Sequence, residues 1–148
     1  MPLTVLILCT GNSARSQMAE AIIRHASHGR IEVLSAGSAP QAEIHPKART
    51  AVHKLLNLDM EGQHPKHLDQ FIGQTFDYVI TVCDRAAESC PVFPGDPERL
   101  HWSFEDPAAV AGSEEQQQRA FDNVARGLVT GVRLWMNLPA VGRAVDGD

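Results

Sequence analysis

Residues 3–28 constrain the fold of this 148-residue chain more than any other stretch. Residues 3–8 are almost continuously apolar, and a run without polar alternation predicts a parallel strand buried on both faces. Small and polar residues follow from Cys9 to Ser16, and residues 16–28 then place apolar side chains at helical spacing. A buried strand, a short loop and a helix in this order predict an α/β fold with a parallel sheet.

The rest of the chain repeats this alternation. Further strands are predicted at residues 30–36, 76–82 and 100–102, a helix that starts at Pro46, and a long helix at residues 114–138. We therefore expect a single-domain, three-layer fold over residues 1–138, in which a four-stranded parallel sheet carries helices on both faces. Residues 139–148 are small and polar, and we expect them to form a flexible C-terminal tail.

Composition argues against several classes of function. Hydrophobic residues make up 43% of the chain, but no apolar run approaches the roughly 20 residues of a membrane span, and the N-terminus lacks the basic region of a signal peptide. The net charge of −5 and the lack of Lys/Arg runs argue against a nucleic-acid partner. Three cysteines make an odd count without a dense disulfide framework, so their thiols are available for chemistry. We expect a cytoplasmic monomer.

The loop after the first strand has the composition of an oxyanion site built around a thiol. Cys9 opens it and Arg15 closes it, with five residues between them. The backbone amides of such a loop can form a nest for an anion, and the next helix adds positive potential at its N-terminus. We expect Cys9 to be a nucleophile whose pKa this field lowers, and Arg15 to hold two oxygens. The predicted oxyanion-binding residues are Thr10, Gly11, Asn12, Ser13, Ala14, Arg15 and Ser16.

The other two cysteines bear on the kind of reaction. Cys83 follows the predicted strand 76–82, and parallel strands end at one edge of a sheet, so Cys9 and Cys83 should lie together. Cys90 comes seven residues later, and a helix over residues 83–90 would separate the two Cα atoms by about 10.5 Å. A disulfide tolerates at most about 7 Å. If Cys83 and Cys90 bond, the segment between them must bend or unwind.

A family resemblance becomes visible at these residues. The segment Cys9–Glu20, CTGNSARSQMAE, strongly resembles the signature of low-molecular-weight protein tyrosine phosphatases and of the arsenate reductases that share their fold. The reductases of the thioredoxin-coupled type are the closer match. Their further marks follow in order: Ser35-Ala36-Gly37, Thr81-Val82-Cys83 with Cys90-Pro91, and HWSFEDPA at residues 101–108.

The resemblance implies a route from arsenate to arsenite, for resistance to arsenic. Cys9 attacks arsenate held by Arg15 and the loop amides, and Asp106 protonates the leaving oxygen. Cys83 then attacks Cys9, and arsenite leaves with the electron pair. Cys90 attacks Cys83, and thioredoxin or a glutaredoxin-type thiol donor reduces the resulting Cys83–Cys90 disulfide. The resemblance implies no bound cofactor, and phosphate or sulfate would act as an analogue of arsenate.

Two alternatives remain open. The same loop would serve a low-molecular-weight phosphatase that hydrolyses phosphomonoesters, although Ala108 stands where such phosphatases usually carry an aromatic residue. The second alternative is a protein that senses oxyanions or redox state and turns nothing over.

No metal site is predicted. Histidines stand at spacings that match no zinc-ligand pattern: His45, His53, His64 and His67. Some thioredoxin-linked relatives bind potassium near residues that match Asn12, Glu20 and Ser35, and they carry an acidic residue where Lys66 stands here. We expect the Lys66 ammonium to occupy that place beside Glu20.

Overall fold

Four parallel strands form the predicted sheet, with β1 and β3 as its inner strands. The computed structural model describes residues 2–146. The strands are β1 (Leu3–Cys9), β2 (Ile31–Gly37), β3 (Tyr78–Thr81) and β4 (Glu98–His101), in the order β2-β1-β3-β4. Every neighbouring pair is parallel, so all four carboxyl ends lie at one edge of the sheet.

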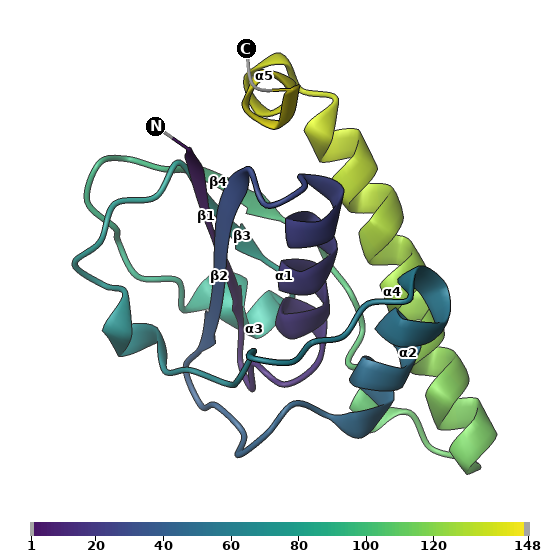
Figure 1. Cartoon of the computed structure of the whole chain (residues 1–148). Coiled ribbons are helices and arrows are strands. Elements are labelled where there is room, and N and C mark those ends of the chain that lie inside the picture. The colour runs from purple at the N-terminus through teal and green to yellow at the C-terminus, as the bar shows by residue number, and fades with distance from the viewer. Residues whose placement is uncertain (1, 147–148) are drawn as a thin grey trace.

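Helices flank this sheet and complete the predicted α/β fold. They are α1 (Arg15–Ala26), α2 (Pro46–Leu56), α3 (Asp84–Glu88), α4 (Glu114–Met136) and α5 (Pro139–Asp146), with 3-10 turns η1 (Leu68–Gln70) and η2 (Pro107–Ala109). Figure 1 shows α1, α2 and α4 on one side of the sheet, whereas η1 and the chain around it lie on the other. Within residues 2–146, no helix combines the length and apolar character needed to cross a bilayer.

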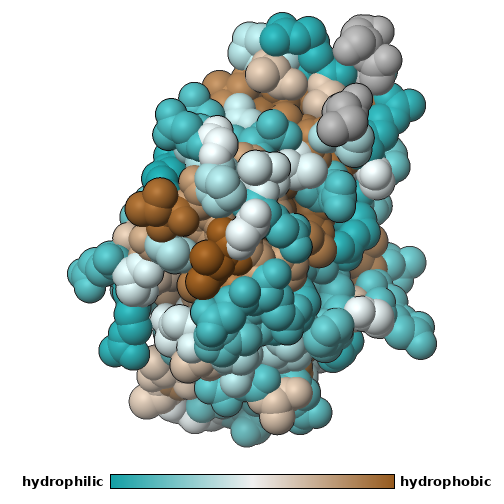
Figure 2. Space-filling model, turned by 90° about the vertical axis from the view of Figure 1, so that its left-hand side faces the viewer, coloured by the Kyte–Doolittle hydropathy of each residue, from teal (hydrophilic) through white to brown (hydrophobic). Residues whose placement is uncertain are grey.

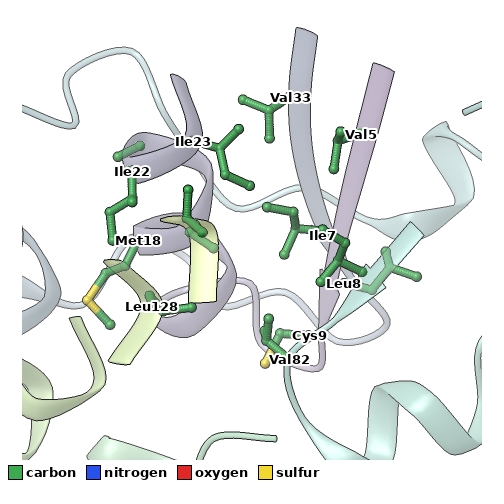
Figure 3. Close-up of a cluster of buried hydrophobic side chains, with 14 of the residues drawn as sticks. Val5, Ile7, Leu8, Cys9, Met18, Ile22, Ile23, Val33, Val82 and Leu128 are labelled. Carbon is green, nitrogen blue, oxygen red and sulfur yellow. The ribbon is translucent and has the colours of Figure 1, made fainter. Parts of the chain in front are cut away.

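Apolar side chains of β1 and α1 pack with α4 to form the main core. Figure 3 shows this cluster, in which Leu128 of α4 meets α1, and Cys9 and Val82 lie at the end where β1 finishes. Met18, Ile23 and Leu128 are fully buried. Each such side chain contributes about 1.5–3 kcal/mol relative to an exposed position. The strand end that carries Cys9 is therefore supported by the best-packed part of the molecule.

The other side of the sheet is covered by a smaller aromatic cluster. Phe76 contacts Phe71 and Phe93 edge-on, with ring centroids 6.3 and 5.9 Å apart. The surface on this side is mainly hydrophilic, with a few hydrophobic side chains between polar ones (Figure 2). Val92 is one of the large apolar residues that stay exposed, at 86%.

Strand β4 begins at Glu98, two residues before the start that the sequence predicted. Its register pairs Thr81 of β3 with His101. It is an edge strand, and three of its four residues are exposed. Such a strand lacks the apolar run from which strands are predicted, so its bounds are set by pairing with β3 rather than by its own composition.

Helix α5 occupies the segment for which the sequence predicted a flexible tail, and here the structure differs from that expectation. Pro139 starts the helix, Val141 is fully buried, and Arg30 Nη1 donates to the Val145 carbonyl oxygen at 2.6 Å. A short helix gains little from its own hydrogen bonds, so packing of this kind is what stabilises it. Residues 147–148 of the predicted tail lie outside the described residues.

Candidate active site

The loop between β1 and α1 borders a cavity of about 870 Å³. Residues 9–15 line it, together with Cys83 after β3 and Asp106 and Ala108 after β4. The expectation that the parallel strands bring Cys9 and Cys83 together is confirmed by this placement. Of the predicted oxyanion-binding residues, Ser16 alone lies behind the cavity wall, where it is fully buried.

Asn12 holds the loop in shape from behind. It has a left-handed backbone conformation, with φ of 47°, and it is fully buried. Its Nδ2 donates to Ser16 Oγ at 2.8 Å and to Ser35 Oγ at 3.0 Å. Its Oδ1 accepts from Gln17 Nε2 at 3.1 Å and from the Lys66 amide at 2.8 Å. These bonds occupy the Asn12 side chain, so its contribution to an oxyanion site would come from the backbone amide.

Glu20 extends this support and attracts the predicted cation. Its Oε1 accepts from Ser35 Oγ at 2.8 Å, and its Oε2 pairs with Arg24 Nη2 at 2.8 Å. Lys66 Nζ lies 3.9 Å from Glu20 Oε1 and donates to the His64 carbonyl oxygen at 2.9 Å. Burial lowers the pKa of Lys66, and Glu20 opposes that shift. The predicted proximity of Lys66 and Glu20 is confirmed.

The described residues contain no cluster of metal-binding side chains. Within residues 2–146, the His, Cys, Asp and Glu side chains form no group of three that could bind a metal ion. His45 lies at the cavity, but it caps α2 by accepting from the Lys47 amide at 3.1 Å. Burial lowers the pKa of His45.

The Cys9 and Cys83 thiols ionise as a coupled pair. A hydrogen bond with Cys83, followed by burial, raises the pKa of Cys9 above its ordinary range, although Arg15 opposes this. The same hydrogen bond lowers the pKa of Cys83 to about 5 against the effect of burial, with help from Thr10 and Ala86. Thr10 Oγ1 lies 3.6 Å from Cys83 Sγ. Neighbouring thiols do not both ionise readily, so the pair carries one charge, mainly on Cys83.

This result corrects the expectation of a lowered pKa for Cys9 in the reduced protein. That expectation considered the loop amides and Arg15, and it left out the second thiol. A proton transfer within the pair, from Cys9 to Cys83, is a route by which this arrangement can produce a Cys9 thiolate. Such a transfer moves a proton between neighbouring sulfurs and needs no further base.

Arg15 connects the thiol loop, residues 9–15, to the segment that carries Asp106, the predicted general acid. Its Nη1 donates to the Phe104 carbonyl oxygen at 2.8 Å, two residues before Asp106. Asp106 is exposed at the cavity, and its Oδ1 accepts from the Ala108 amide at 3.0 Å, which caps η2. A thiol, a guanidinium and a carboxyl group thus line one cavity. These groups are sufficient for covalent displacement at a tetrahedral oxyanion.

A network that the sequence did not predict fixes the chain around Cys83. His101 Nδ1 lies 2.8 Å from Thr81 Oγ1, and its Nε2 lies 2.9 Å from Asp84 Oδ1. Ser103 Oγ also donates to Asp84 Oδ1, at 3.3 Å. The histidine therefore bridges the residues on both sides of Cys83. His101 stood in a family-like motif, but its partners on β3 and α3 become apparent only when the strands are paired.

Cys90 is held apart from this cavity. Helix α3 separates it from Cys83, and all three cysteines are free thiols. Cys90 is half-buried and borders a separate narrow void behind Cys9 and Ala86. In the reduced protein, the chain between Cys83 and Cys90 thus has the helical conformation that cannot accommodate a disulfide.

Comparisons with known proteins agree with this geometry. The model of the family named low molecular weight phosphotyrosine protein phosphatase matches residues 4–138. The arsenate reductase of Halalkalibacterium halodurans is 38% identical over 120 residues, which cover 81% of this chain and 85% of that protein. A solved structure described as an arsenate reductase in the phosphate binding state has a TM-score of 0.71 at 26% identity, and the match covers 90% of this chain and 96% of that one.

A thioredoxin-dependent arsenate reductase from Corynebacterium glutamicum is also similar in structure. It has a TM-score of 0.60 and 29% identity, and the match covers 90% of this chain and 63% of that one. The family model extends over most of the residues that form the sheet, the thiol loop and α4. On these grounds the chain belongs to the low molecular weight phosphotyrosine protein phosphatase family.

Proposed function

We propose that this protein is an arsenate reductase that converts arsenate to arsenite with electrons from its own thiols. The observation that carries the proposal is the second thiol, Cys83, at the wall of the cavity that contains Cys9. Hydrolysis of a phosphomonoester needs one nucleophilic thiol. Reduction of As(V) to As(III) needs two electrons, which two thiols supply when they become a disulfide. Arsenate reductases among the sequence relatives support the same conclusion.

The first step uses the cavity as an oxyanion site. The loop amides and Arg15 hold arsenate, Cys9 attacks arsenic as a thiolate, and Asp106 gives a proton to the oxygen that leaves as water. Cys83 then attacks the Cys9 sulfur. The Cys9–arsenic bond breaks, its electron pair stays on arsenic as As(III), and a Cys9–Cys83 disulfide forms.

The last step inside the protein transfers the disulfide to Cys90. The Cys90 thiolate attacks Cys83, and Cys9 leaves as a thiolate, ready for another turnover. Helix α3 must unwind for this exchange, because its spacing keeps the two sulfurs apart. Only five residues form α3, so few hydrogen bonds are lost when it opens.

A dithiol protein of the thioredoxin type is the proposed reductant, and arsenic detoxification in the cytoplasm is the proposed role. An intramolecular disulfide is a substrate for dithiol exchange. A thioredoxin-dependent arsenate reductase among the structural neighbours supports this choice. The exposed segment that follows α3 gives such a reductant access to Cys90.

A coupled assay tests the proposal. Arsenate, thioredoxin, thioredoxin reductase and NADPH are supplied, and NADPH absorbance is followed. We expect the wild type to oxidise one NADPH for each arsenate, and Cys83→Ser to oxidise none. Cys90→Ser should release at most one arsenite per protein, because its Cys9–Cys83 disulfide is not transferred. A wild-type protein without arsenate-dependent NADPH oxidation would overturn the proposal.

Phosphatase activity is the second candidate, because Cys9, Arg15 and Asp106 are sufficient for it and the family model carries that name. The substitution Cys83→Ser separates the two functions. A phosphatase keeps its turnover of p-nitrophenyl phosphate in this variant, whereas a reductase loses arsenate turnover. Physiological phosphatase activity would require a catalytic efficiency toward a phosphomonoester well above that toward arsenate.

A further inference from the structure

Arg99, on the edge strand β4, contacts Cys90, the thiol that attacks Cys83 in the last proposed step. Its Nη1 donates to Cys90 Sγ at 3.0 Å, and its Nη2 donates to the Pro91 carbonyl oxygen at 3.1 Å. The planar guanidinium presents its N–H donors in a fixed fork, and here two of them reach two consecutive residues. The Cys90 thiol can itself donate to the Pro91 oxygen at 3.6 Å. Arg99 thus hydrogen-bonds to both the Cys90 sulfur and the Pro91 carbonyl oxygen.

Arg99 places its positive charge directly against the Cys90 sulfur. A thiolate accepts an N–H donor from a cation more strongly than a thiol does, and a neighbouring arginine is a common cause of thiol activation. Among residues 2–146, Arg99 is the charged side chain that hydrogen-bonds to Cys90. Glu88, the acidic residue nearest to Cys90 in the sequence, and Glu98, the neighbour of Arg99 on β4, are exposed to solvent, which screens their effect.

We infer that Arg99 is a positioning residue for the final disulfide exchange: its guanidinium holds the Cys90 sulfur against β4 and places a positive charge beside it, until α3 unwinds and Cys90 attacks Cys83. This inference rests on the proposed arsenate reductase function. In the step that it assists, the Cys90 sulfur bonds to Cys83, the Cys9–Cys83 bond breaks, and Cys9 leaves with the bonding pair. Exchange consumes no oxidant beyond the arsenate that formed the first disulfide.

The contact also distinguishes the reduced protein from the oxidised one. The segment between Cys83 and Phe93 is anchored at both ends, because Cys83 is buried after β3 and Phe93 is 2% exposed in the aromatic cluster. Arg99 holds this segment between its two anchors. Cys90 must leave this contact when α3 unwinds, because the helix separates it from Cys83. The same side chain therefore holds the segment in the reduced protein, and the contact is lost in the protein that carries the Cys83–Cys90 disulfide.

Alkylation tests the contact without arsenate. In the double variant Cys9→Ser, Cys83→Ser, Cys90 is the remaining thiol, and its reaction with iodoacetamide is followed by mass spectrometry. Adding Arg99→Ala should slow alkylation by about threefold to tenfold at pH 7, because the positive charge that assists the reacting Cys90 sulfur is removed. The difference should disappear near pH 10, where the thiol ionises in either protein. Arg99→Lys should recover part of the rate.

The exposed Arg49 on α2 provides a matched control, and Arg49→Ala should leave alkylation unchanged at both pH values. A purely structural role of Arg99 predicts the opposite of the expected result, since a loosened segment would expose Cys90 and speed its alkylation at every pH. Equal or faster alkylation of the Arg99→Ala protein at pH 7 would overturn the inference.

A single turnover with arsenate tests the exchange step in the protein with all three cysteines. After one equivalent of arsenate and an acid quench, Arg99→Ala should release arsenite at the wild-type rate and accumulate the Cys9–Cys83 disulfide about threefold to tenfold longer. Equal lifetimes would contradict the positioning role. Failure of the wild type to release arsenite would instead refute the proposed function, and the alkylation rates would still decide whether Arg99 activates Cys90.

Discussion

Gly37 allows the thiol loop to approach β2, and replacing it with alanine should impair catalysis directly. Gly37 pairs with Cys9 at the end of the sheet. A Cβ atom at this position would lie 2.3 Å from the Thr10 carbonyl oxygen and 2.8 Å from that of Cys9. Carbon and oxygen normally approach to about 3.3 Å, so the Thr10 carbonyl must retreat by about 1 Å. The obstacle is backbone, which has no flexible end that could turn away.

The expected magnitudes follow from that displacement. Overpacking of a well-packed site costs about 1–3 kcal/mol of unfolding free energy. Misplacing a reacting group by about 1 Å costs about 100-fold in rate. Thr10 follows the nucleophile directly, so we expect Gly37→Ala to slow arsenite release in a single turnover by about 100-fold.

Stopped single turnovers and urea unfolding measure these two effects. Gly73→Ala is the control, because no atom lies within 4 Å of the added Cβ and neither glycine has a positive φ. It should change the unfolding free energy by less than about 0.5 kcal/mol and leave turnover unchanged. If Gly37→Ala stays within about threefold of the wild-type rate, the close approach of β2 to the loop does not position Cys9.

Three further predictions address the site. Because the pKa of Cys83 is lowered to about 5, alkylation of Cys83 by iodoacetamide should reach half its maximal rate near pH 5. In Cys9→Ala, this midpoint should shift to higher pH, because the hydrogen bond from Cys9 is lost. The contribution of the Cys83 thiol to the unfolding free energy should fall as the pH is lowered from about 9 to 5. Asp106→Asn, which keeps the η2 cap, should slow the first step by about 100-fold or more with little change in urea unfolding. Wild-type turnover should be equal in KCl and NaCl, whereas Lys66→Met should lose about 1–3 kcal/mol of stability and recover part of it in KCl.

The parts of the fold that could be predicted from sequence are those with local signals. The apolar run of β1, the small residues from Cys9 to Ser16 and the helical spacing of α1 follow one another, so strand, loop and helix were predictable together. The parallel order of the strands then placed Cys83 beside Cys9. Edge strand β4 and helix α5 have weak local patterns, and their structure depends on contacts with β3 and with residues such as Arg30.

The site could be predicted only in outline, because its details depend on contacts between distant segments. The Lys66–Glu20 pair was predicted from the family resemblance and is present. The His101 bridge and the Arg99–Cys90 contact join β4 to the segment after β3, and neither contact was predicted. The pKa of Cys9 was predicted wrongly for a related reason: a loop considered alone lacks the neighbouring thiol.

The disulfide left after one turnover is the most direct test of the reaction that separates this protein from a phosphatase. Reduced protein is mixed with one equivalent of arsenate without any other thiol, quenched, alkylated and mapped by mass spectrometry. We expect a Cys83–Cys90 disulfide, a free Cys9 that takes the alkyl group, and one arsenite per protein. Recovery of all three cysteines as alkylated thiols, with no arsenite formed, would contradict the proposed dithiol chemistry.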